Sequence, residues 1–127
     1  MSQPFLTVIA TEAAEKTTLR ITGTIQDHTG AALPSASLTT LKLWLYNKRT
    51  GVVLNNRMAV NVLNANGGTV TSGGLLTMVL DPADNALESQ SLAAETHVAE
   101  FEWTYNAGAA TGRALVEFNV RNFTKVS

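Results

Sequence analysis

The chain has 127 residues, with nine basic and ten acidic side chains and no cysteine. Charged residues make up 15% of it, against about 25% in an average soluble domain. The length fits one domain, and the missing cysteines exclude disulfides, thiolate chemistry and cysteine-based metal sites. A net charge of −1 argues against non-specific nucleic-acid binding. No apolar run reaches the roughly 20 residues of a membrane span, so neither nucleic acid nor membrane is an expected partner.

Residues 1–16 predict an N-terminal arm or opening strand, and residues 17–127 the folded domain. The first four residues carry no positive charge, so we expect no cleaved export signal. The apolar stretch 5–10 predicts a strand that pairs with an exposed sheet edge, in the same chain or in a neighbouring subunit. Glu12 and Lys16 have helical spacing, but the segment around them is too short for a stable helix.

Apolar and polar residues alternate with a period of two in four later segments. These are residues 18–25, 41–46, 97–105 and 113–121. Such alternation is typical of half-buried antiparallel strands. In the first segment Gly23 takes an inward position, where a neighbouring strand can approach closely.

Weaker patterns predict further strands within residues 52–54, 58–63 and 75–80. Turn residues separate the strands, and Asn66-Gly67 suits a type I′ hairpin. Residues 83–94 predict a short helical turn. The fold class is therefore all-β, a single antiparallel β-sandwich of seven or eight strands.

Few residues have the chemistry of a catalytic or metal site. His28 falls in a polar turn, and His97 begins a strand at the edge of the predicted core. Two distant histidines cannot supply the three or four ligands of zinc. Asp81 and Asp84 fit the capping of a turn better than a calcium site. We therefore expect no metal and no cofactor.

The acidic pair Glu100 and Glu102 projects from the outer face of a predicted strand. Paired carboxylates are the machinery of glycosidases, but cross-strand ion pairs with Arg113 and Arg121, alongside Glu117, explain them more simply. The chain contains neither a Gly-x-Ser-x-Gly motif nor a phosphate-binding glycine loop. No catalytic residue is expected, and a hydrolase based on Glu100 is the weakest hypothesis.

Trp44 and Tyr46 alternate out of phase with the leucines of their strand, so they are predicted to face outward with Lys42. Outward tryptophan and tyrosine are enriched at protein interfaces. A covering loop of the same chain is an equal alternative, and a sugar-binding platform is a third.

Two stretches resemble a known family. Residues 21–38, ITGTIQDHTGAALPSASL, match the opening hairpin of bacterial and phage Ig-like domains at six positions: Ile21, Gly23, Ile25, Asp27, Gly30 and Leu33. Residues 72–87 and 95–122 resemble Ig-like domains of tailed-phage virion proteins, with a Trp-x-Tyr strand before a hairpin and a closing Phe-x-Val strand.

The resemblance implies an Ig-like sandwich and a non-enzymatic structural protein of the virion, synthesised in the host cytoplasm. Its partners would be other virion proteins of the capsid, neck or tail, and the subunit would be a homo-oligomer. The predicted partner-binding residues are Trp44, Tyr46, Lys42, Phe5, Val8 and Asn66. The alternative is a carbohydrate- or receptor-binding module that uses Trp44, Tyr46 and the loop 66–74.

Overall fold

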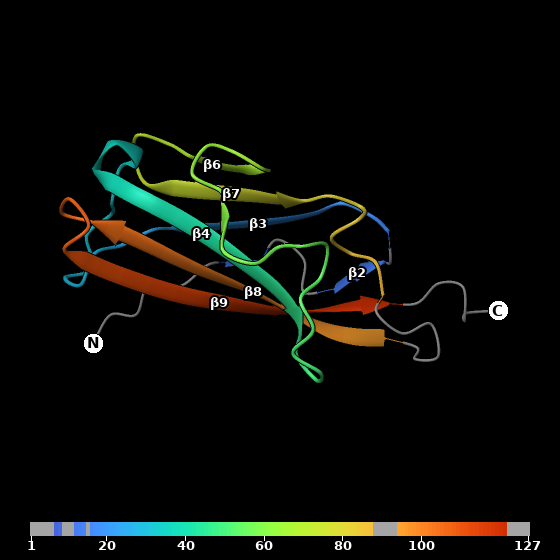
Figure 1. Cartoon of the computed structure of the whole chain (residues 1–127). Coiled ribbons are helices and arrows are strands. Elements are labelled where there is room, and N and C mark those ends of the chain that lie inside the picture. Colours follow the sequence, from blue (N-terminus) through green and yellow to red (C-terminus); the bar gives the residue numbers. More distant parts are fainter. Residues whose placement is uncertain (1–6, 9–11, 15, 88–93, 122–127) are drawn as a thin grey trace.

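Two packed β-sheets form the molecule (Figure 1). The structure, a computed structural model, describes residues 7–8, 12–14, 16–87 and 94–121. The four-stranded sheet has the order β1-β3-β7-β6, and the five-stranded sheet has the order β2-β9-β8-β4-β5. The strands are β1 (Thr7–Val8), β2 (Glu12–Ala14), β3 (Leu19–Thr24), β4 (Leu38–Asn47), β5 (Val60–Asn61), β6 (Gly68–Val70), β7 (Leu75–Leu80), β8 (Ala94–Tyr105) and β9 (Ala110–Arg121).

The predicted all-β sandwich is confirmed. The strand order is that of the Ig fold, with β1, β3, β7 and β6 in one sheet and β9, β8 and β4 in the other. Nine strands are assigned among the described residues instead of seven or eight, because short β2 and β6 were not expected, while the predicted strand at residues 52–54 forms only an isolated bridge between Val53 and Tyr46. One pairing also departs from the prediction, since β2 runs parallel to β9.

The N-terminal segment contributes to both sheets of its own chain. Thr7 pairs with Thr22 and the backbone of Val8 pairs with Ile21, while β2 pairs with the end of β9. Phe5 lies outside the described residues. The described part of this segment therefore forms two short strands, one in each sheet.

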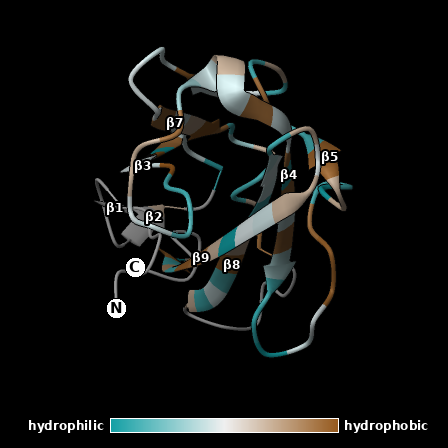
Figure 2. Ribbon diagram, turned by 90° about the vertical axis from the view of Figure 1, so that its left-hand side faces the viewer, coloured by the Kyte–Doolittle hydropathy of each residue, from teal (hydrophilic) through white to brown (hydrophobic). Residues whose placement is uncertain are grey.

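The core follows from the alternation along the long strands, which Figure 2 shows as bands of changing hydropathy. Antiparallel pairing of β4 with β8 and of β8 with β9 aligns the apolar positions of all three strands on one face. Fully buried side chains on that face and across the core include Leu41, Leu43, Leu45, Phe101 and Ile21. The opposite face of β4, β8 and β9 is left for contacts outside the core.

The turn at Asn66-Gly67 has the predicted conformation but a different role. Both residues have positive φ, 53° and 97°, as a type I′ turn requires, and the N–H of Gly68 bonds the carbonyl of Ala65 at 2.9 Å. The flanking strands β5 and β6 belong to different sheets. The expected hairpin is therefore wrong, because this turn carries the chain across the sandwich.

The outer edge of the four-stranded sheet is β6. Its two N–H groups that face away from β7, those of Gly68 and Val70, are both bonded by the preceding loop. Gly68 donates to the carbonyl of Ala65 and Val70 donates to Oδ1 of Asn64, each at 2.9 Å. This edge therefore presents no unbonded N–H group.

Helical structure is scarce among the described residues. The segment before β8 begins with a turn in which Asp84 N–H bonds the Asp81 carbonyl at 3.0 Å and Asn85 N–H bonds the Pro82 carbonyl at 3.2 Å. The rest of the predicted helical turn, residues 88–93, lies outside the described part. One 3-10 helix, η1 (Ser35–Ser37), precedes β4, and no helix that the structure describes is long and apolar enough to cross a membrane.

Candidate functional site

The outward side of β4, β8 and β9 carries the most distinctive surface of the described chain. We define the β4/β8/β9 face by nine residues in three rows across the strands. The rows are Lys42–Glu102–Arg113, Trp44–Glu100–Leu115 and Tyr46–Val98–Glu117.

The middle row of this face places the apolar side chains of Trp44 and Leu115 on either side of Glu100. Leu115 is 55% exposed, one of the most exposed large apolar side chains in the described residues, and Trp44 in the same row and Tyr46 in the next row are half-buried. Val98 points outward but is only 2% exposed, since its neighbours cover it. The predicted outward orientation of Trp44 and Tyr46 is confirmed, and their role in partner binding stays a prediction.

Two ion pairs lie on this face, one on each side of the middle row. Arg113 Nη2 contacts Glu102 Oε2 at 2.5 Å, which confirms a cross-strand ion pair between these strands, and Lys48 Nζ contacts Glu117 Oε1 at 3.0 Å. Exposed pairs of this kind contribute at most about 1 kcal/mol to stability. Because each pair joins a cation to a carboxylate, the charges of the face nearly cancel.

Tyr46 and Glu100 meet within the face. The Tyr46 hydroxyl donates a hydrogen bond to Glu100 Oε1 at 3.4 Å. Partial burial raises the pKa of Tyr46, and the neighbouring Glu100 carboxylate raises it further. The phenol is therefore a neutral donor at physiological pH, and it orients the carboxylate beside Trp44.

Asn66 lies apart from Trp44 and Tyr46, in a depression of about 440 Å³ at the end of the sandwich. Its side-chain amide donates to the carbonyl of Asn61 at 2.8 Å. The depression is lined by Asn55, Asn56, Arg57, Val60, Asn66, Gly67, Val79 and Asp81. The expected sugar-binding platform of Trp44, Tyr46 and the loop 66–74 is thus not assembled in this depression.

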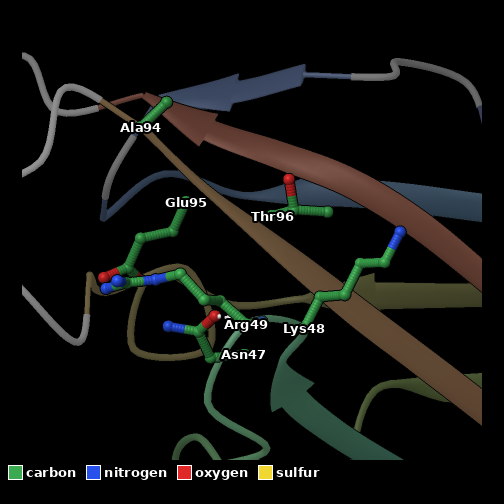
Figure 3. Close-up of a pocket in the computed structure, with 6 residues that line it drawn as sticks. All are labelled: Asn47, Lys48, Arg49, Ala94, Glu95 and Thr96. Atoms are coloured by element: carbon green, nitrogen blue, oxygen red, sulfur yellow. Dashed lines mark hydrogen bonds between the residues drawn. The ribbon is translucent and has the colours of Figure 1, made fainter.

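A second hollow, of about 480 Å³, opens beside the start of β8 (Figure 3). Its lining includes Asn47, Arg49 and Glu95, and Figure 3 shows the Arg49 guanidinium pointing toward the Glu95 carboxylate. Glu95 Oε1 contacts His97 Nε2 at 2.9 Å, and both side chains are buried. His97 also packs edge-on against Phe118, with ring centroids 5.8 Å apart.

The histidine–carboxylate pair resembles the orienting pair of a general base, but its ring faces the core. Nδ1 of His97 is buried without a hydrogen-bond partner among the described residues. The predicted core-edge histidine with one hydrogen bond is confirmed. Because the ring packs on Phe118, the pair is best assigned to the stability of this end of the sandwich.

A third cluster is built around a buried ion pair. Arg57 Nε and Nη2 bond the two oxygens of Asp84 at 2.8 and 2.9 Å, and Arg57 Nη1 bonds the Asn66 carbonyl at 2.9 Å. Asp84 also accepts from Asn55 Nδ2 and from the N–H of Asp81. The cluster therefore ties together the loop after β4, the turn after β7 and the turn at Asn66.

Asp81 and His28, which were considered for a metal site and expected in turns, both lie in turns. Asp81 Oδ1 accepts the N–H of Asp84 at 3.0 Å, as expected of a turn-capping residue. His28 is exposed in its turn, with Nδ1 3.2 Å from the Tyr105 hydroxyl. The described residues contain no group of three histidines and carboxylates placed to hold a metal ion.

Two features of the site were not singled out from the sequence. Leu115 is an apolar residue on the outward phase of its strand, and that signal was present in the alternation. Its position in one row with Trp44 depends on the register through β8, which the pattern does not specify. The buried pair of Arg57 and Asp84 had no sequence signal.

Comparisons with protein-family models, with curated proteins and with solved structures find no match to the chain.

Proposed function

We propose that the chain is a non-enzymatic structural protein of a tailed-phage virion, a repeated subunit that docks on other virion proteins of the capsid, neck or tail. The docking surface is the β4/β8/β9 face. The observation that carries the proposal is the exposed Leu115 on the same face as half-buried Trp44 and Tyr46, with charge pairs around them. The virion setting comes from the resemblance of residues 21–38, 72–87 and 95–122 to phage Ig-like domains.

The composition of the face favours a protein partner. Protein interfaces combine an apolar centre, rich in tryptophan and tyrosine, with a polar rim that excludes water. Here Trp44 and Leu115 supply apolar area on either side of Glu100, and the Arg113–Glu102 and Lys48–Glu117 pairs supply the rim. An exposed leucine adds area for a protein contact but gives no hydrogen bond to a sugar hydroxyl.

A carbohydrate- or receptor-binding module is the second candidate. Trp44 and Tyr46 support it, because aromatic faces stack on sugar rings and both side chains point outward. The separate position of Asn66 weakens it, since the polar groups that would fix a sugar are not beside the aromatic pair.

The test deletes the gene from the phage or prophage that carries it and supplies variants from a plasmid. Leu115→Asp replaces the most exposed apolar side chain of the β4/β8/β9 face with a charge, and we expect at least about tenfold less of this variant in purified particles. The matched control is Leu75→Asp, since Leu75 is 43% exposed on the other sheet. Absence of the wild-type chain from particles would overturn the virion setting, and equal incorporation of both variants would overturn the docking surface.

A further inference from the structure

The outward residues of β9 have opposite charges at equal distances from Leu115. Arg113 precedes Leu115 by two positions and Glu117 follows it by two, so all three share one side of the strand. The side chains of Arg113 and Glu117 are 67% and 43% exposed. If the direction of this strand is reversed about Leu115, the positions of Arg113 and Glu117 are therefore exchanged.

The outward residues of β4 are arranged about Trp44 in a similar way. Lys42 precedes Trp44 by two residues and Tyr46 follows it by two. On reversal of the strand, the ammonium of Lys42 exchanges places with the ring of Tyr46. A lysine over an aromatic ring is an attractive cation–π pair.

We propose that the β4/β8/β9 face binds a second copy of this chain about a two-fold axis that runs across the strands, along the row Trp44–Glu100–Leu115. This inference depends on the proposed function, for which it names the partner of the docking surface. The axis lays each strand antiparallel on its own copy, as in an isologous dimer. Leu115 then meets the partner's Leu115, and Arg113 meets the partner's Glu117 twice, once on each side of the axis.

About the same axis, the contacts made by β4 are favourable, and the contact made by Glu100 on β8 is unfavourable. Trp44 packs on the partner's Trp44, and Lys42 lies over the partner's Tyr46. Glu100 faces the partner's Glu100, and like charges opposite each other oppose association. The Tyr46 hydroxyl, 3.4 Å from Glu100, supplies a donor to each of these carboxylates.

A two-fold axis along β8 instead of across it is disfavoured by charge. That axis places β9 over the partner's β4 with the rows aligned, so Arg113 lies over the partner's Lys42. It also places Glu102 over the partner's Glu102. Like-charge contacts across an interface select against a wrong arrangement, and therefore the axis across the strands is the one that the charges favour.

The area of the face sets the strength of the dimer. Standard strand spacings give the three strands and three rows of the face a footprint of roughly 15 by 20 Å. A standard specific interface buries about 800 Å² per partner, so this contact is small and the dimer is weak in dilute solution. Repetition of the subunit on one particle raises the effective concentration and strengthens the same contact.

The test is sedimentation velocity of the full chain over a concentration series, with charge-exchange variants. Wild type is expected to move from monomer to dimer as concentration rises. Arg113→Glu alone and Glu117→Arg alone each place like charges across the axis, and each is expected to weaken self-association by at least about tenfold. An equimolar mixture of the two variants restores both opposite-charge contacts, so the mixture is expected to dimerise although neither variant does alone.

Two further variants make the result decisive. Glu100→Gln removes the repulsion on the axis and is expected to strengthen the dimer. Leu75→Asp, on the other sheet, is expected to leave the dimer unchanged. A wild type that is monomeric at all concentrations, or a mixture that fails to dimerise, overturns the inference. If such a monomer still enters particles through Leu115, the docking surface stands and its occupant is another virion protein.

Discussion

Arg57 and Asp84 form a two-pronged pair inside the protein, with Nε on Oδ1 at 2.8 Å and Nη2 on Oδ2 at 2.9 Å. Asp84 is fully buried and Arg57 is 8% exposed. The pair joins the loop after β4 to the turn after β7, and Arg57 reaches the carbonyl of Asn66 as well. A guanidinium with a planar fork is suited to hold three loops at once, which a lysine could not do.

The first prediction follows from this pair. Arg57→Met leaves the Asp84 carboxylate buried without its cation, and loss of one partner of a buried pair costs about 3–5 kcal/mol. Urea unfolding should show that loss as a lower midpoint. Arg20→Met is the control, because Arg20 is exposed on β3 and its loss should change the free energy of unfolding by less than about 0.5 kcal/mol. Equal midpoints for the two variants would contradict the assignment.

The second prediction concerns acid. Burial raises the pKa of the Asp84 carboxyl, but hydrogen bonds from Arg57, Asn55 and the Asp81 N–H outweigh burial and hold the pKa below its ordinary value. The stabilisation is complete above the unfolded-state pKa of about 3.9 and is lost as the pH falls through the folded-state pKa. Asp84→Asn should therefore be less stable than wild type near neutral pH.

The difference between Asp84→Asn and wild type should shrink as the pH falls below about 4, where the carboxyl of the unfolded wild-type chain begins to bind a proton, and it should be lost once the pH is below the folded-state pKa. Urea unfolding of both proteins at neutral and acidic pH measures this. A difference that stays constant across that range would show that the charge of Asp84 is not what stabilises the loops.

The third prediction concerns Gly112 on β9. A Cβ at this position would overlap the indole ring of Trp103, which is 1% exposed and donates from Nε1 to the Gln26 carbonyl at 3.2 Å. Gly112→Ala should therefore cost about 1–3 kcal/mol of unfolding free energy through overpacking. Gly73→Ala has ordinary contacts only and serves as the control. Thermal melts that do not separate the two variants would contradict this packing.

The fourth prediction separates the two tryptophans by fluorescence. Trp44 is half-buried on the outer face, and Trp103 lies in the core. Acrylamide should quench the wild type mainly through Trp44, so Trp44→Phe should remove most of the quenching and shift the remaining emission to shorter wavelength. Trp103→Phe should leave the quenchable component in place. Strong quenching in Trp44→Phe would place Trp103 in solvent and contradict the fold.

The fifth prediction distinguishes the two candidate functions. If the β4/β8/β9 face docks on protein, the wild-type chain should show no binding on a glycan array. Saturable glycan binding that Trp44→Ala abolishes and Leu75→Asp retains would favour the carbohydrate-binding candidate. The Leu75 variant controls for a general loss of folded protein, because it lies on the other sheet.

The four long strands were predictable because each alternates strictly, and their alternation is set by one buried face. The same reasoning placed Trp44 and Tyr46 outward. It could not place Leu115 beside them, since that contact depends on the register of two strand pairs. The pattern also could not predict that β5 and β6 belong to different sheets. Turn preferences at Asn66-Gly67 are local, whereas the sheet that a strand joins is set by the tertiary structure.

The buried ion pair of Arg57 and Asp84 could not be predicted from the sequence either. Arg57 and Asp84 are 27 residues apart in sequence, and both residue types are normally exposed. Each is buried because the other neutralises it, so neither position alone carries a signal. Glu95 next to His97 is a similar case, in which a carboxylate on the inward phase of β8 is satisfied by local contacts.

The bonded edge of β6 has a consequence for how copies of this chain can associate. A strand from another molecule extends a sheet by accepting hydrogen bonds from free N–H groups at its edge. At β6 those of Gly68 and Val70 already bond Ala65 and Asn64, so an incoming chain finds no donors there. Asn64 and the loop before β6 thus protect this edge against extension by a strand of another copy, which is the first step of fibril-like growth.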